Sequence, residues 1–183
     1  KENTPMTHKE LLKQFACNDI RFVLVGGLAM RIYNSPRVTH EMDLAVRTVD
    51  LDTIIDLMYH HLYYLITNID NAYVSLKLDP EAAKQWVEHT KSGSLSFLQF
   101  YSDPVRESVE MEKVDASSQV DILVELDIPI MRLLERANTI RLEDVSFHVA
   151  SVEDLITLKK QRSDKSPADE DDIRFLQNLL DES

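Results

Sequence analysis

The apolar positions of the chain follow two spacings, one typical of helices and one typical of strands. Leu11, Leu12 and Phe15 recur at helical spacing, and comparable stripes return further along the chain. Such stripes predict amphipathic helices, while short runs of β-branched and aromatic residues predict strands. The predicted helices cover residues 7–17, 28–33, 50–65, 79–89, 128–137, 152–160 and 168–180. The predicted strands cover residues 22–25, 95–101 and 119–124, a segment that carries Glu41 and Asp43, and a strand or hairpin within 140–149.

The stretch from Phe22 to Val46 contains most of the candidate functional residues. A buried strand runs into Gly26-Gly27, and a short helix follows that ends at Ser35-Pro36. Gly27 allows a ligand to approach the backbone, and the helix N-terminus would direct free N–H groups at an anion. This layout is typical of a phosphate-binding turn.

Three acids are candidates for a metal site. Glu41 and Asp43 lie two positions apart, so they share one face of their predicted strand. Asp121 interrupts a run of β-formers, and a buried carboxylate needs a partner. Metal ions shared among the three acids would provide that partner.

Composition narrows the functional classes. The chain has 183 residues with 20 basic and 32 acidic side chains, so its net charge is 20 − 32 = −12. This charge disfavours a broad nucleic-acid-binding surface, although local basic residues and metal ions could still bring a nucleic acid to the site. No apolar stretch approaches the roughly 20 residues that span a bilayer, so we expect no membrane partner.

Cysteine usage and the first residues indicate a compartment. Cys17 is the single cysteine, which excludes a disulfide framework, and Lys1 to Pro5 do not resemble a signal peptide. We therefore expect a cytoplasmic protein. Because Cys17 ends an amphipathic helix, we expect it to be a small core residue.

The central stretch resembles a known superfamily. Val25-Gly26-Gly27, the spacer 28–40 and Glu41-Met42-Asp43-Leu44 resemble the signature of polymerase-beta-like nucleotidyltransferases. Arg37-Val38-Thr39 is similar to the smaller branch that contains the abortive-infection AbiE-type toxins. Segment 149–159, together with Asp169 and Asp172, resembles the C-terminal part of that branch.

The resemblance implies a fold and a reaction. The fold would be α/β (of the α+β kind), with a small mixed, mostly antiparallel sheet flanked by helices. Residues 1–126 would form the catalytic core, and residues 127–183 a mainly helical C-terminal part packed on it. The activity would be metal-dependent transfer of a nucleoside monophosphate from a nucleoside triphosphate to a hydroxyl on a tRNA end, a protein or a small molecule. Some relatives are toxins paired with an antitoxin, so an antitoxin or regulator is an expected partner.

The resemblance also implies residue roles. Glu41, Asp43 and Asp121 would be the catalytic acids and would hold Mg²⁺, or Mn²⁺ in its place. The residues expected at the nucleotide are Gly26, Gly27, Arg37, Thr39 and Lys159. Arg37 could equally be a surface residue and Lys159 a helix-end lysine, while Asp169 and Asp172 would be structural or auxiliary.

The sequence leaves one alternative function open and excludes two other nucleotide-binding motifs. Glu41 stands where the branch more often has aspartate, which favours a non-catalytic nucleotide-binding or regulatory module that keeps the fold. A Rossmann site is excluded because no third glycine follows Gly26-Gly27 at the required spacing, and the chain has only 3 glycines. A Walker-type loop lacks its Gly-Lys-Ser/Thr.

Overall fold

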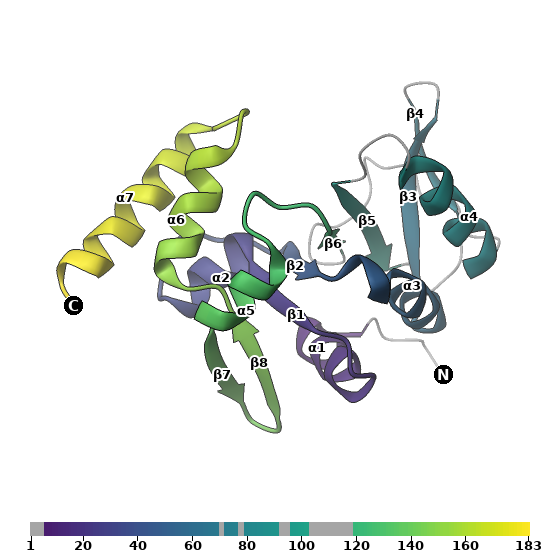
Figure 1. Ribbon diagram of the computed structural model, residues 1–183, viewed down its shortest axis with the longest axis horizontal. Helices are drawn as coiled ribbons and strands as arrows, with labels where there is room; N and C mark the ends of the chain where they lie inside the picture. Colours follow the sequence, from purple (N-terminus) through teal and green to yellow (C-terminus); the bar gives the residue numbers. More distant parts are fainter. Residues whose placement is uncertain (1–5, 70–71, 77–78, 92–95, 103–118) are drawn as a thin grey trace.

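The computed structural model describes residues 6–69, 72–76, 79–91, 96–102 and 119–183. An eight-stranded sheet in the order β4-β3-β5-β6-β2-β1-β8-β7 runs through the molecule. Helices α6 and α7 lie at one end of it and α3 and α4 at the other (Figure 1). The strands are β1 (Phe22–Val25), β2 (Met42–Val46), β3 (Tyr63–Ile69), β4 (Ala72–Leu76), β5 (Phe97–Ser102), β6 (Gln119–Leu123), β7 (Asn138–Leu142) and β8 (Val145–Val149).

The sheet is mixed. Strand β2 runs antiparallel to β1 and parallel to β6, and β1 runs parallel to β8. The remaining pairs, β3 with β4, β3 with β5, β5 with β6 and β7 with β8, are antiparallel. The prediction of a mixed, mostly antiparallel sheet flanked by helices is confirmed.

Most predicted helices are present, and several begin at the predicted caps. Thr7 and Glu10 form a capping box at α1, and the Ser151 hydroxyl accepts a hydrogen bond from the Asp154 backbone N–H at α6. The Asp79 carboxylate accepts one from Ala82 at the start of α4. The helices are α1 (His8–Cys17), α2 (Gly26–Ile32), α3 (Leu51–His60), α4 (Pro80–Lys91), α5 (Ile130–Arg136), α6 (Val152–Gln161) and α7 (Pro167–Asp181), with a 3₁₀ turn η1 (Thr48–Asp50).

The central strands are the most completely buried part of the sheet. Val23 in β1, Leu44 in β2 and Ile122 in β6 have no exposed surface. Burying aliphatic side chains of this size stabilises the fold by about 1.5–3 kcal/mol each. Asp43 and Asp121 therefore project from a well-packed base.

The predicted helix over residues 50–65 is too long. Helix α3 ends at His60, and Leu62 adopts a left-handed backbone with φ 63° before β3 begins. The last residues of the predicted helix, from 63 to 65, belong instead to β3, which forms a hairpin with β4. Asp50 occupies the N-cap position of α3 without a capping hydrogen bond, because its carboxylate binds the Arg47 guanidinium instead.

The C-terminal part contributes to the sheet as well as to the helices. Strands β7 and β8 form a hairpin that extends the sheet beside β1. The boundary at residue 126 stays a prediction, and it does not coincide with an edge of the sheet. The polar segment 103–118 and part of the predicted loop after α4, residues 92–94, lie outside the described residues.

Cys17 is exposed, so its assignment to the core was wrong. It is the last residue of α1, where the helix ends, while the apolar side of this helix consists of Leu11, Leu12 and Phe15. Among the described helices, none combines the length and the apolar character that crossing a membrane requires.

Candidate active site

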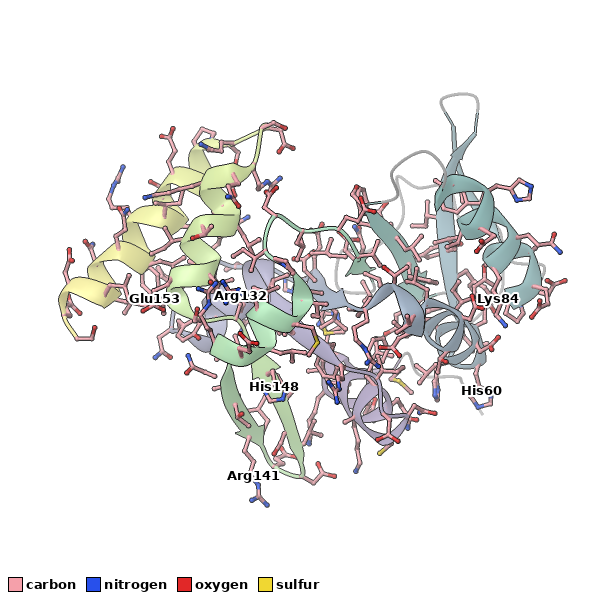
Figure 2. The ribbon with its side chains drawn as sticks, viewed as in Figure 1. His60, Lys84, Arg132, Arg141, His148 and Glu153 are labelled. Atoms are coloured by element: carbon pink, nitrogen blue, oxygen red, sulfur yellow. The ribbon has the colours of Figure 1, made fainter. Side chains whose placement is uncertain are left out.

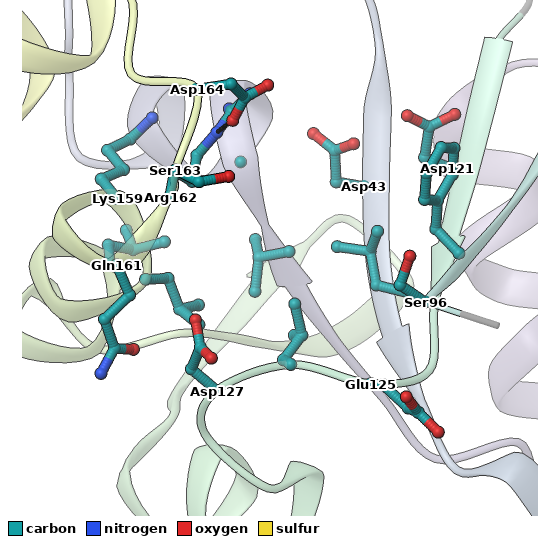
Figure 3. Close-up of a pocket in the computed structure, with 17 residues that line it drawn as sticks. Asp43, Ser96, Asp121, Glu125, Asp127, Lys159, Gln161, Arg162, Ser163 and Asp164 are labelled. Atoms are coloured by element: carbon teal, nitrogen blue, oxygen red, sulfur yellow. Dashed lines mark hydrogen bonds and ion pairs between the residues drawn. The ribbon is translucent and has the colours of Figure 1, made fainter. Parts of the chain in front are cut away.

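Two carboxylates lie side by side in the middle of the sheet. Asp43 of β2 and Asp121 of β6 are direct partners in the parallel register, so their backbones are about 4.8 Å apart and their side chains share a face. Both side chains point into the same pocket (Figure 3). Gln119 donates a hydrogen bond of 3.2 Å to Asp121. Within the described ranges, no basic side chain forms an ion pair with either aspartate.

The electrostatics of this pair favour a bound cation. Burial raises the pKa of Asp43 to about 7, and the nearby charges of Asp121 and Glu41 contribute to the rise. Burial also raises the pKa of Asp121, again with a contribution from Glu41. The charges of Lys159 and Arg162 offset only part of the rise at Asp43, and a divalent ion would further stabilise the two carboxylates in their charged form.

Gly26 fits closely against one of these acids. It begins α2 with φ +68°, and a Cβ at this position would lie 2.0 Å from Asp43 Oδ2. Only glycine satisfies both the left-handed backbone and this contact. A Cβ on Gly27 would lie 2.7 Å from Thr39 Oγ1, so the second glycine lets segment 34–41 pack against α2.

The pocket has a volume of about 600 Å³. Its lining includes Gly26, Asp43 and Asp121 from the sheet side, and Lys159 and Arg162 from α6 and the residue that follows it. Figure 3 shows these basic side chains on one side of the pocket and Asp121 on the other, with Asp43 between them. The pocket thus has a basic side next to the carboxylate pair.

Lys159 is almost fully buried, with 7% of its surface exposed. Its ammonium group lies 2.8 Å from the Asp172 carboxylate and 3.5 Å from that of Asp169. Both acids belong to α7, so α7 fixes the lysine that α6 supplies to the pocket. Arg162 lies 3.6 Å from Asp169 and also binds Asp164.

Three candidate residues occupy the segment between α2 and β2. Glu41 is exposed and immediately precedes β2, and it does not line the pocket. Arg37 forms an ion pair with Asp172, and Thr39 packs against Gly27. In the part of the chain that the structure describes, no group of three acidic, histidine or cysteine side chains lies close enough to hold a metal together.

The structure therefore brings together Gly26, Asp43, Asp121 and Lys159 around one pocket. Gly27, Arg37, Thr39 and Glu41 lie next to it, in α2 and the segment before β2. The roles assigned to all eight residues stay predictions. The donor set nevertheless suits Mg²⁺ or Mn²⁺, because two adjacent carboxylates supply hard oxygen ligands.

Several residues that line the pocket were not singled out from the sequence, among them Arg162 and Phe97. Arg162 directly follows α6 in an extended conformation, with φ −60° and ψ 132°, so helical spacing from Lys159 gave no signal for it. Phe97 lines the pocket from β5 and is 48% exposed. Its place in a predicted strand gave no indication that it faces a pocket.

The family match places the chain in the nucleotidyltransferase class. The chain matches the family model described as "Nucleotidyl transferase AbiEii toxin, Type IV TA system" over residues 10–161, and it belongs to this family. The resemblance to a minimal, AbiE-type nucleotidyltransferase is confirmed. No curated protein sequence matches the chain.

Among solved structures, the fold is similar to that of the lincosamide antibiotic adenylyltransferase LnuA in a lincomycin-bound crystal structure. The TM-score is 0.56 at 13% sequence identity, and the match covers 95% of this chain and 98% of that one. At this identity the similarity establishes the shared nucleotidyltransferase fold.

Proposed function

We propose that the chain uses a divalent metal ion to move a nucleoside monophosphate from a nucleoside triphosphate to a hydroxyl acceptor. The observation that carries this proposal is the Asp43–Asp121 pair, which shares a pocket with Gly26 and Lys159. Family membership supports the same reaction class.

Asp43 and Asp121, with Glu41 from the segment before β2, would hold Mg²⁺ or Mn²⁺. When bound, such an ion would neutralise phosphate charge and lower the pKa of the attacking hydroxyl. Asp121 would accept the proton of that hydroxyl, a role supported by the burial that raises its pKa.

The nucleotide would lie along the basic side of the pocket. Gly26 and Gly27 keep side chains away from the backbone there, and Lys159 and Arg162 supply positive charge for the phosphates. Arg37 and Thr39 would act at the rim.

We place the reaction in the cytoplasm, with an antitoxin or regulator as partner, since the family comprises toxins of type IV toxin–antitoxin systems. The acceptor would be a protein side chain, a small molecule or a tRNA end. The net charge of −12 supports the first two, or a basic partner protein. The antibiotic named for the structural neighbour supports testing small molecules.

The decisive experiment offers the chain each of four labelled nucleoside triphosphates, with Mg²⁺ or Mn²⁺, in the presence of total cellular RNA, protein or lincomycin. The native chain is compared with Glu41→Ala/Asp43→Ala, with Asp121→Asn, and with the control Asp52→Asn at an exposed position of α3. We expect transfer by the native chain and the control alone, and a fall of orders of magnitude for Asp121→Asn.

Unchanged transfer by Asp121→Asn would remove that residue from the mechanism. Metal-dependent nucleotide binding without transfer to any acceptor would instead indicate the non-catalytic module.

A further inference from the structure

The segment 34–41 joins α2 to β2 without helix or strand and carries three of the candidate residues. Backbone hydrogen bonds from Asn34 and Ser35 join its start to α2, and two further contacts involve its side chains. Thr39 packs against Gly27, and the Arg37 guanidinium pairs with Asp172 of α7. Glu41, at the end of this segment, is exposed. Its position relative to Asp43 is therefore set by β2, which begins at the next residue, and by how firmly those two contacts hold the segment.

Asp172 serves two cations at once. Its Oδ2 atom pairs with Nη1 of Arg37 and lies 2.8 Å from Nζ of Lys159. The Asp172 side chain is only 4% exposed, so its charge depends on these partners. Arg37 comes from the Glu41 segment and Lys159 from the pocket wall. One carboxylate thus joins two parts of the site that are far apart in sequence.

Asp169 has a different set of partners. It lies 3.5 Å from Lys159 and 3.6 Å from Arg162, and it caps α7 through Ser166. Lys159 would consequently keep one carboxylate if Asp172 lost its charge. In the described part of the chain, Arg37 pairs with Asp172 and with no other acid. Loss of the Asp172 charge should therefore affect the segment 34–41 more than it affects Lys159.

We propose that Asp172 is a positioning residue, which holds the Glu41-bearing segment 34–41 and the pocket lysine Lys159 in one arrangement through Arg37. The catalytic consequence of this inference rests on the proposed function. The link from Arg37 through Asp172 to Lys159 does not depend on it. Helix α7 lies beyond the end of the family match at residue 161, and through Asp172 it would contribute to the active site. Helix α7 packs beside α6, the helix that carries Lys159 (Figure 1).

The test compares Asp172→Asn with Asp171→Asn. Asparagine keeps the size of the side chain and can still accept a hydrogen bond, but it lacks the charge that Arg37 needs. Asp171 is the adjacent exposed acid, and its partner Arg174 lies on the surface. Both variants lose one negative charge from the same turn of α7.

The first readout needs neither metal nor nucleotide. Trypsin cleaves between Arg37 and Val38 only when it can bind the Arg37 guanidinium. Val38 is 76% exposed, but the ion pair with Asp172 keeps the guanidinium from the protease. In Asp172→Asn the segment should release Arg37 more often, and we expect cleavage after Arg37 to be about tenfold faster. A tenfold change corresponds to about 1.4 kcal/mol in the equilibrium between the bound and the released segment. In Asp171→Asn the cleavage rate should match that of the native chain.

The second readout is kinetic. Loss of a residue that orients another functional group typically costs about 10- to 100-fold, and we expect this fall in kcat for Asp172→Asn. The KM for the nucleotide should change less, since Asp169 still holds Lys159. The double variant Arg37→Gln/Asp172→Asn should be no more than about twofold slower than Asp172→Asn, because both changes remove the same contact.

Binding of Mn²⁺ without nucleotide, followed by electron paramagnetic resonance, should weaken in Asp172→Asn and not in Asp171→Asn. The proposal is overturned if Asp172→Asn keeps native trypsin cleavage at Arg37, native kcat and native Mn²⁺ affinity, even if its melting temperature falls. Should the native chain transfer no nucleotide, the proposed function fails separately. Faster cleavage after Arg37 would then still support the link, and unchanged cleavage would refute it.

Discussion

Asp43 combines burial with two neighbouring negative charges. Burial, with help from Asp121 and Glu41, raises its pKa from 3.8 to about 7. The folded chain therefore binds this proton more tightly than the unfolded chain. Stability from protonated Asp43 is fully present below about pH 4 and is lost as the pH rises through about 7. The metal-free protein should accordingly be strained at its carboxylate pair in alkaline solution.

Asp43→Asn should relieve this strain. We expect the free energy of unfolding of the metal-free variant to match that of the native chain near pH 4 and to exceed it at pH 8 by up to about 4 kcal/mol. The measurement is urea denaturation in the presence of EDTA at both pH values. Asp52→Asn, a change at an exposed residue of α3, should show little difference between them. An equal gap between Asp43→Asn and native protein at both pH values would contradict the argument.

Gly26 offers a steric test of the same acid. In Gly26→Ala, the new Cβ would lie 2.0 Å from Asp43 Oδ2 on a backbone with φ +68°. Strain and displacement of the carboxylate should lower the free energy of unfolding by about 1–3 kcal/mol, and transfer activity should fall at least about tenfold. In an Asp43→Ala background the stability loss should be smaller, because the clashing oxygen is gone. An equal loss in both backgrounds would show that the backbone alone is responsible.

The candidate site could be predicted where the chemistry lies on regular structure. Asp43 and Asp121 interrupt runs of β-formers, and the Gly pair stands directly after a buried strand, so local pattern was enough to single them out. Glu41 was expected on the strand, but β2 begins one residue later. Its position depends on contacts of Arg37 and Thr39 that no local pattern encodes.

At the scale of elements, helices with strong caps were predicted within a few residues. The β3–β4 hairpin was not, because Leu62 and Leu65 continue the apolar stripe of α3 at helical spacing. The left-handed conformation of Leu62 ends that helix, and leucine is not a residue that predicts such a conformation. The antiparallel pairing of β3 with β5 then outweighs the helical pattern.

Pairing between distant strands was also beyond the sequence pattern. Strand β8 joins the sheet beside β1 through the parallel pair Leu24 and Val149. Alternation predicted a hairpin there, but not its place in the sheet. That placement brings α6, which follows β8, to the end of β1 where Gly26 lies, so it determines that Lys159 reaches the pocket.

At the scale of the whole molecule, the basic side chains of the described residues are dispersed, and most of them form ion pairs with acids. Figure 2 places Lys84 on α4, Arg132 on α5 and Arg141 near the end of the β7–β8 hairpin. Lys84 lies within 2.9 Å of both Asp56 and Glu81. Lys9 and Lys13 of α1 pair with Glu143 and Asp144 in the turn between β7 and β8. Most basic side chains of the described residues are thus already paired with acids, and the net charge of −12 further opposes binding of a phosphate backbone.

This distribution predicts a weak salt dependence for any transfer to RNA. Each phosphate contact costs about threefold in affinity when salt rises from 50 to 200 mM, and six to ten contacts cost about 10³- to 10⁵-fold. With Mg²⁺ saturating, we expect RNA labelling to change by less than about tenfold over this range. Lys159 and Arg162 are the basic side chains that line the described pocket, and the proposed function assigns both to the nucleotide. The measurement is the initial rate of label transfer at limiting RNA, with lincomycin or protein as the comparison that lacks a phosphate backbone. A fall of a thousandfold for RNA alone would require a basic surface that neutralises many phosphates, and would make a tRNA end the preferred acceptor.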